Sequence, residues 1–119
     1  MPRILVLEDE PLIAMMLQDW LEEIGCETIG PAHTVQSALD LLQGARPDGA
    51  LLDVSLQHGE KCYPVASDLR DRRVLFAFLT GYAAEHVDAR FGDVPVLCKP
   101  LEFESFKGAI AKLLSPRQS

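Results

Sequence analysis

The chain has 119 residues, enough for one domain with its own core, and we expect a single domain over residues 1–119 with no output domain. Its formal net charge of −7 argues against nucleic acid as a partner, because lysine and arginine are the residues that hold a phosphate backbone. No apolar run approaches the roughly 20 residues of a membrane-spanning helix and the N-terminus lacks a signal-peptide pattern, so we expect a cytoplasmic protein without membrane contact.

The first half of the chain alternates apolar runs with helical periodicity. A strand is predicted at residues 4–7, followed by a helix that begins near Pro11 and ends before Gly25. A weaker strand at residues 26–31 precedes a second helix at residues 35–42, and a third strand follows at residues 50–52. These runs are continuous rather than alternating, which is typical of parallel strands buried on both faces.

The second half repeats the alternation. A helix at residues 62–71 carries Pro64, which fits only a first turn, and strands are predicted at residues 74–79 and 94–98. Between those strands lies a short, weakly patterned helix at residues 83–89, and a final helix covers residues 103–114. Five strands and five helices in alternation predict a three-layer, doubly wound α/β fold with a parallel sheet. At this length we expect the flavodoxin-like strand order 2-1-3-4-5, in which ligands bind beyond the carboxyl ends of the strands.

Cysteine and histidine spacing argues against a zinc site. The cysteines at positions 26, 62 and 98 are far apart and free of CxxC spacing, so we expect small buried hydrophobes in a reducing compartment. The histidines at positions 33, 58 and 86 lack ligand spacing and are expected at the surface or in loops.

Polar side chains stand directly after four of the predicted strands. They are Glu8 and Asp9, then Asp53, then Thr80, then Lys99. The carboxyl ends of parallel strands meet at one edge of a sheet, so these side chains should converge. Carboxylates that lie close together need a counter-ion, and Mg2+ prefers oxygen ligands while keeping waters that leave room for a phosphate. Asp53 is then the candidate nucleophile of a phosphoryl transfer that forms an acyl phosphate, with an ammonium and a hydroxyl donor beside it.

The segments LVLEDE, LLDVSL, FLTGY and VLCKPL resemble, in this order and over essentially the whole chain, the receiver domain of two-component response regulators. The resemblance implies a phosphorelay in which Asp53 accepts phosphate from a histidine kinase or a histidine phosphotransfer protein. It implies that Mg2+, with Mn2+ as an alternative, is bound by Asp9, Asp53 and the backbone carbonyl of Ser55. Glu8 would act on the ion mostly through water.

The same resemblance assigns the residues that meet the phosphoryl group. Thr80 would swing toward it, the Gly81 amide would contact it, and Lys99 would pair with it. A cis peptide between Lys99 and Pro100 is also implied.

The segments FLTGY and VPVLCKP further resemble the FAT GUY subgroup, whose members are often single-domain receivers that HWE-type histidine kinases phosphorylate. Leu79 departs from the alanine in that name. Most receivers carry an aromatic switch residue three positions before the lysine, where this chain has Val96. Tyr82, two residues after Thr80, is the candidate substitute, with simple ring packing as the alternative.

The resemblance implies a phosphoprotein that is not a conventional enzyme and has at most self-phosphorylation and autodephosphorylation activity. The aspartyl phosphate form is expected to signal through contact with an unidentified downstream protein, or to act as a phosphate sink, as a monomer or weak dimer. The alternative is a pseudo-receiver, an interaction module that does not depend on phosphorylation.

Other functions fit the residues less well. A haloacid-dehalogenase-type phosphatase needs a second aspartate two residues after the nucleophile, where Ser55 stands. A flavodoxin-type cofactor binder needs a phosphate loop of small residues after the first strand, where carboxylates stand. Taken singly, Glu10 suits a helix N-terminal acid and Asp53 a turn residue. One shared site explains four strand ends together.

Overall fold

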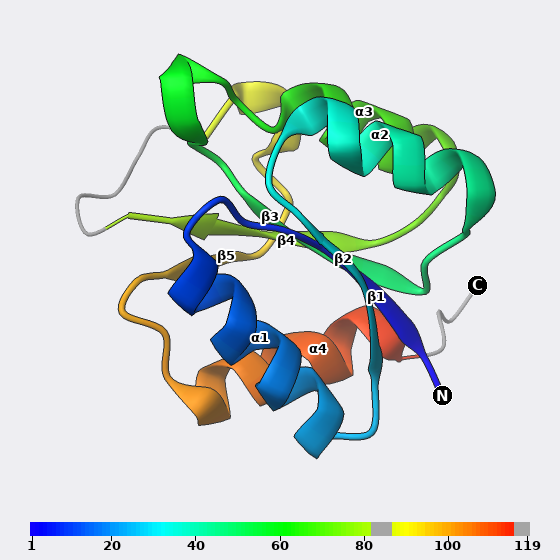
Figure 1. The fold of residues 1–119 in the computed structure, drawn as a ribbon, viewed down its shortest axis with the longest axis vertical. Coiled ribbons are helices and arrows are strands. Elements are labelled where there is room, and N and C mark those ends of the chain that lie inside the picture. The colour runs from blue at the N-terminus through cyan, green and yellow to red at the C-terminus, as the bar shows by residue number, and fades with distance from the viewer. Residues whose placement is uncertain (82–86, 116–119) are drawn as a thin grey trace.

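The computed structural model describes residues 1–81 and 87–115, and its sheet has five parallel strands in the order β2-β1-β3-β4-β5 (Figure 1). The strands are β1 (Arg3–Leu7), β2 (Glu27–Ala32), β3 (Gly49–Asp53), β4 (Phe76–Thr80) and β5 (Val96–Cys98). The predicted doubly wound fold and its strand order are confirmed.

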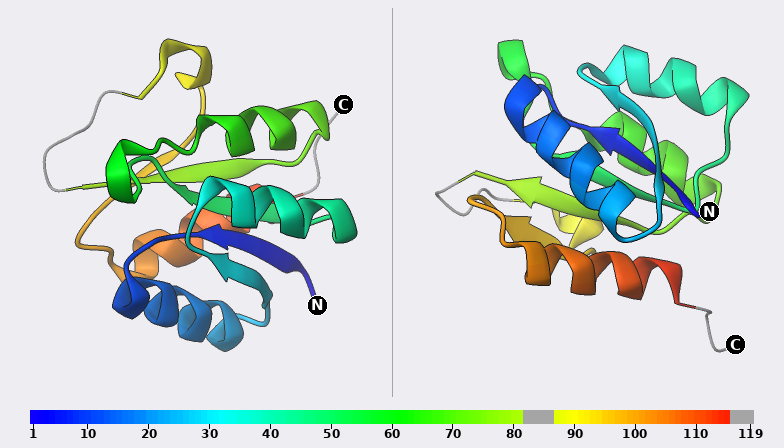
Figure 2. Two further views of the ribbon diagram at one scale, coloured as in Figure 1. Left: turned by 45° about the horizontal axis from the view of Figure 1, so that its top comes forward. Right: turned by 60° about the horizontal axis from the view of Figure 1, so that its bottom comes forward.

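Four α-helices cover the sheet in the described ranges. They are α1 (Pro11–Glu23), α2 (Val35–Gly44), α3 (Tyr63–Asp71) and α4 (Phe103–Leu114). Figures 1 and 2 show α2 and α3 on one face and α1 and α4 on the other. Within residues 1–81 and 87–115, no helix is long and apolar enough to cross a membrane.

The sheet separates two hydrophobic cores, and successive residues of a strand enter opposite ones. Leu5 and Leu7 of β1 join the core under α2 and α3, whereas Ile4 and Val6 join the core under α1 and α4. All four side chains are fully buried. A central parallel strand must therefore be apolar at every position, which explains its continuous apolar run.

Helix starts follow their sequence signals. Pro11 and Pro64 occupy the first turns of α1 and α3, where proline removes no helical hydrogen bond. Thr34 caps α2, because its side-chain oxygen accepts a hydrogen bond of 3.0 Å from the Ser37 N–H.

Two strands begin two residues later than predicted. Val74 and Val94 are apolar like the strands they precede, but their amides close turns. The Val74 N–H donates to the Leu69 carbonyl at 2.9 Å, and the Val94 N–H donates to the Phe91 carbonyl at 3.0 Å. These amides are therefore not available to the sheet.

The predicted helix at residues 83–89 falls mostly on residues 82–86, which lie outside the described residues. After them, Asp88 accepts a hydrogen bond of 2.9 Å from the Arg90 N–H and begins a short 3-10 turn at Ala89–Phe91.

The expectation that all three cysteines are buried is wrong for Cys98. Cys26 and Cys62 are buried, whereas Cys98 is exposed, and all three are free thiols. Cys98 ends β5, which is the short edge strand of the sheet and has a neighbour on one side only.

Candidate functional site

Every buried polar or charged residue of the described chain lies at the carboxyl edge of the sheet. Glu8 follows β1, Asp53 ends β3 and Thr80 ends β4, with exposed fractions of 0%, 3% and 1%. Buried polar groups are unfavourable unless they are paired, so three of them in one place indicate a site rather than a core. The predicted convergence of these strand ends is confirmed.

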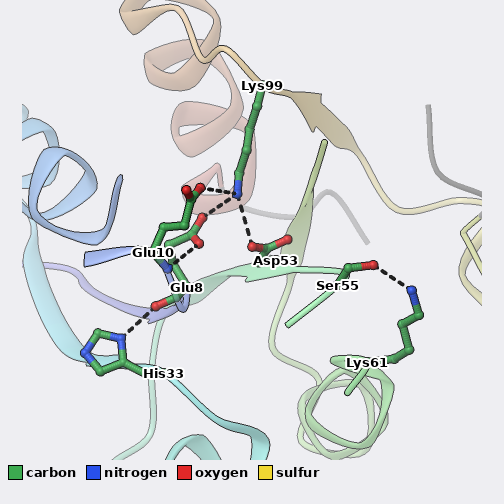
Figure 3. A network of polar contacts seen from close by, with 7 residues as sticks. All are labelled: Glu8, Glu10, His33, Asp53, Ser55, Lys61 and Lys99. Atoms are coloured by element: carbon green, nitrogen blue, oxygen red, sulfur yellow. Dashed lines mark hydrogen bonds and ion pairs between the residues drawn. The ribbon is translucent and has the colours of Figure 1, made fainter. Parts of the chain in front are cut away.

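Lys99, which follows β5, supplies the cation of this cluster. Its Nζ lies 3.1 Å from Asp53 Oδ2, 2.9 Å from Glu8 Oε1 and 3.8 Å from Glu10 Oε2 (Figure 3). Burial opposes the charge of the lysine, but the Glu8 and Asp53 carboxylates outweigh burial and raise the pKa of Lys99. The ammonium group therefore stays protonated.

Glu10 lies at the N-terminus of α1, as its sequence position indicates, and also contacts the site. It is the N-cap residue of α1, yet its side chain makes no capping hydrogen bond there. The side chain lies beside Lys99 instead, as Figure 3 shows. Glu10 is thus the third carboxylate beside the lysine, after Glu8 and Asp53.

Asp53 has a strongly shifted pKa. Burial is the largest cause, the Glu8 carboxylate is the second, and Lys99 opposes both, so that the pKa of Asp53 rises from 3.8 to about 7. Near neutral pH a large share of Asp53 therefore carries a proton. A nearby cation would favour the ionised carboxylate, which is the form that can act as a nucleophile.

The donor set fits a hard divalent cation. Glu8, Asp9 and Asp53 each offer a carboxylate oxygen, and these oxygens lie within 4.8 Å of one another. Lys99 Nζ faces the carboxylates of Glu8, Asp53 and Glu10, and Asp9 lies beside Glu8 and Asp53, so that negative charge exceeds positive charge in this cluster. Mg2+ binds carboxylate oxygens and keeps several waters, so these residues are able to hold it.

Backbone and side-chain contacts fix Glu8. The Glu10 N–H donates to Glu8 Oε2 at 3.0 Å, and the Glu8 N–H donates to the Ala32 carbonyl at 3.0 Å. His33 Nδ1 donates to the Glu8 carbonyl at 2.8 Å, which ties the end of β2 to the loop after β1 (Figure 3). Sequence reasoning missed this role of His33, because the contact depends on the position of the β2 end beside β1.

A hollow of about 330 Å³ opens beside this loop. Its lining includes Asp9, His33, His58 and Glu60. Solvent and small ligands therefore have a route to the Asp9 side of the carboxylate cluster.

Three further predicted features are the Lys99–Pro100 cis peptide, the Ser55 carbonyl and the Gly81 amide. The cis peptide between Lys99 and Pro100 is confirmed. Ser55 follows the site, and its Oγ receives a hydrogen bond of 2.6 Å from Lys61 Nζ (Figure 3), whereas a metal contact of its carbonyl stays a prediction. Gly81 directly follows Thr80 and is partly exposed, and its phosphate contact also stays a prediction.

The switch residues are only partly described. Val96 of β5 is 42% exposed and provides no ring at the position where most receivers have one. Tyr82, the candidate substitute, lies outside the described residues.

The Thr80 hydroxyl has a partner that sequence reasoning missed. Its Oγ1 donates to Cys98 Sγ at 3.5 Å, between residues that face each other in the β4–β5 register. Neither residue lies near the other in sequence, so only the register could have indicated the contact.

Comparison with known proteins agrees with this geometry. The model of the response regulator receiver domain family matches residues 4–111. The solution structure of SdrG from Sphingomonas melonis Fr1 superposes on this chain with a TM-score of 0.86. The two sequences are 45% identical, and the match covers 97% of this chain and 98% of SdrG. The BeF3-activated conformation of SdrG from Pseudomonas melonis Fr1 is 46% identical with a TM-score of 0.81, over 95% and 96% of the two chains.

Curated relatives are longer than this chain. The phyllosphere-induced regulator PhyR of Methylorubrum extorquens is 31% identical over 98% of this chain and 45% of its own length. The transcriptional regulatory protein PdtaR of Mycobacterium tuberculosis is 30% identical over 95% of this chain and 57% of its own length. The chain thus spans about half the length of the curated relatives it matches.

Proposed function

Because the chain belongs to the response regulator receiver domain family, we propose that it is a phosphoacceptor of a two-component phosphorelay and that Asp53 accepts the phosphoryl group. The observation that carries this proposal is the buried Asp53 carboxylate, with Oδ2 3.1 Å from Lys99 Nζ and with two further carboxylates within reach of a shared cation. Phosphoryl transfer depends mainly on such positioning and charge neutralisation.

In this proposal the phosphoryl group passes from a donor phosphohistidine to the Asp53 carboxylate. An Asp53 oxygen forms a bond to phosphorus while the P–N bond of a donor phosphohistidine breaks, and the imidazole leaves with the electron pair. Lys99 balances charge on the transferred oxygens, and Thr80 and the Gly81 amide donate hydrogen bonds to them. Water later attacks the phosphorus, the acyl O–P bond breaks, and inorganic phosphate leaves while the Asp53 carboxylate is restored. In this role the chain is a phosphoacceptor that is itself modified, and not a conventional enzyme.

Glu8, Asp9, Asp53 and the Ser55 carbonyl would hold the divalent cation. When bound, Mg2+, or Mn2+ in its place, supplies positive charge that Lys99 alone cannot provide against the carboxylate cluster. Glu8 is fully buried beside Lys99 and would act on the ion through water.

The phosphorylated form would act in the cytoplasm by contact with a downstream protein. PhyR from Bartonella quintana, which is 25% identical to this chain over 47% of its own length, is described as an anti-anti-sigma factor. A histidine kinase, of the HWE type by the FLTGY resemblance, or a phosphotransfer protein would be the donor. Alternatively, the same chemistry would let the protein act as a phosphate sink that takes phosphoryl groups from its donor.

The test is a titration with Mg2+ and then beryllofluoride, followed by backbone amide NMR. We expect Mg2+-dependent shifts at Asp9, Asp53 and Thr80, and their loss in Asp53→Asn. Asp19→Asn, an exposed aspartate on α1, is the matched control and should respond like the wild type. If the folded wild-type protein showed no amide shifts at these residues with Mg2+ and beryllofluoride, the result would refute the proposal and support the pseudo-receiver alternative.

A further inference from the structure

The buried Thr80 hydroxyl points toward the edge strand. Thr80 is 1% exposed, and its Oγ1 donates to Cys98 Sγ at 3.5 Å. In the sheet, Cys98 pairs with Thr80 on the β5 side of β4, whereas Asp53 pairs with Leu79 on the β3 side. The hydroxyl is thus bonded on the side of β4 away from the phosphoacceptor.

One hydroxyl donates one hydrogen. If Thr80 donates to a phosphoryl oxygen on Asp53, its hydrogen bond to Cys98 must break. A thiol sulfur is a weak acceptor and a charged phosphoryl oxygen is a strong one, so the exchange is favourable once the phosphoryl group is present.

We infer that Cys98 is a positioning residue that holds Thr80 in its resting orientation, and that loss of this hydrogen bond carries the phosphorylation signal to the surface of β5. The inference rests on the proposed function, since it needs a phosphoryl group at Asp53. It assigns a role to a residue that the cysteine spacing alone predicts to be a small buried hydrophobe.

The surroundings of Cys98 suit this role. Cys98 is exposed as a residue although its sulfur contacts a buried hydroxyl, so it joins the site to the surface. Between β5 and the start of α4 it lines a surface pocket of about 270 Å³, together with Val96, Leu101 and Ser105. Val96 has no ring that could follow a movement of Thr80, and the thiol contact provides a direct connection instead.

Removal of the acceptor has a defined thermodynamic consequence. In Cys98→Ala the resting orientation of Thr80 leaves a buried hydroxyl without its sulfur partner, which raises the free energy of the resting form. The activated form, in which Thr80 donates elsewhere, is unaffected. We therefore expect Cys98→Ala to bind beryllofluoride roughly two- to fivefold more tightly at saturating Mg2+, because net hydrogen-bond contributions of this kind are small. Cys98→Ser keeps an acceptor and should stay near the wild-type affinity.

The experiment measures the beryllofluoride affinity of the full chain by amide NMR in a double-mutant cycle. The variants are Cys98→Ala, Cys98→Ser, Thr80→Ala and the double alanine variant, and Cys26→Ala is the matched control at a buried cysteine that packs in the core under α1 and α4. We expect tighter binding in Cys98→Ala, rescue in Cys98→Ser, no change in Cys26→Ala, and no effect of Cys98→Ala when Thr80 is already alanine. Cys98→Val, which fills the space without an acceptor, repeats the test if the alanine variant fails to fold.

The outcomes separate this inference from the proposed function. Equal affinity of Cys98→Ala and the wild type would overturn the role of Cys98, and so would a gain that persists in the Thr80→Ala background. In both cases the wild type still responds to beryllofluoride at Asp53. A wild type without any such response would overturn the proposed function, and this inference with it.

Discussion

Replacement of Asp53 by asparagine should stabilise the folded protein at neutral and alkaline pH when divalent cations are absent. Burial and the Glu8 carboxylate raise the pKa of Asp53 from 3.8 to about 7, although Lys99 opposes the shift. A carboxyl group with a higher pKa in the folded state binds its proton more tightly there. Its ionisation therefore lowers the free energy of unfolding as the pH rises from the unfolded-state pKa to the folded-state pKa. Asparagine has nearly the same shape and does not ionise.

The magnitude follows from the pKa shift. At about 1.4 kcal/mol for each pKa unit, the difference between 3.8 and about 7 sets an upper bound of roughly 4 kcal/mol. Structural relaxation and water reduce the penalty of a buried charge, so we expect a gain of about 2 kcal/mol at about pH 8. The gain should shrink as the pH falls from about 7 to about 4, and vanish below about pH 4, where the carboxyl group is protonated in both states.

Urea unfolding in EDTA at several pH values measures this gain directly. Asp19→Asn is the control, because this exposed aspartate lies outside the carboxylate cluster and should give wild-type stability throughout. Mg2+ should stabilise the wild type more than Asp53→Asn and so narrow the difference between them. Equal stability of Asp53→Asn and the wild type at about pH 8, or a gain that does not change with pH, would refute the electrostatic account of this site.

Three further substitutions test separate parts of the structure. Lys99→Met removes the ammonium 3.1 Å from Asp53 Oδ2 and should slow phosphorylation by acetyl phosphate about 100-fold, while calorimetry still detects Mg2+ binding; an unchanged rate would contradict the role of the lysine. Thr34→Ala removes the cap of α2 and should lower the free energy of unfolding by about 1 kcal/mol in urea, without effect on phosphorylation. Phe106→Ala leaves a cavity at a fully buried position beside Trp20 and should lower the free energy of unfolding by about 3–5 kcal/mol. A loss below about 1 kcal/mol would argue against tight packing there.

Sequence reasoning predicted the architecture and most of the site because both depend on local patterns. Continuous apolar runs separated by periodic helices define parallel strands, and in a parallel sheet the carboxyl ends necessarily share one edge. The positions of Asp53, Thr80 and Lys99 directly after such runs therefore fixed their common location without any knowledge of side-chain contacts.

Features that depend on register and side-chain direction could not be predicted in this way. The contact of Thr80 with Cys98 requires the pairing of β4 with β5, and the contact of His33 with the Glu8 carbonyl requires the position of the β2 end beside β1. Glu10 has the sequence position of a helix-capping acid, yet Lys99 attracts its side chain. In each case a tertiary contact determines the partner of the side chain, and the local sequence alone does not specify that partner.

The charge imbalance at the carboxyl edge connects stability with function. Four carboxylates and one lysine form a cluster in which Glu8 and Asp53 are almost completely removed from water, an arrangement that disfavours the folded state until a cation or a proton relieves it. Substitution of Asp53 by a neutral residue would relieve this penalty, and would also remove a metal ligand and the proposed nucleophile. If Asp53 is the phosphoacceptor, as we propose, the phosphoryl group adds further negative charge, and the same repulsion should make phosphorylation depend on a bound cation. On this proposal, the electrostatic repulsion in the cation-free site would couple the two proposed ligands, the divalent cation and the phosphoryl group.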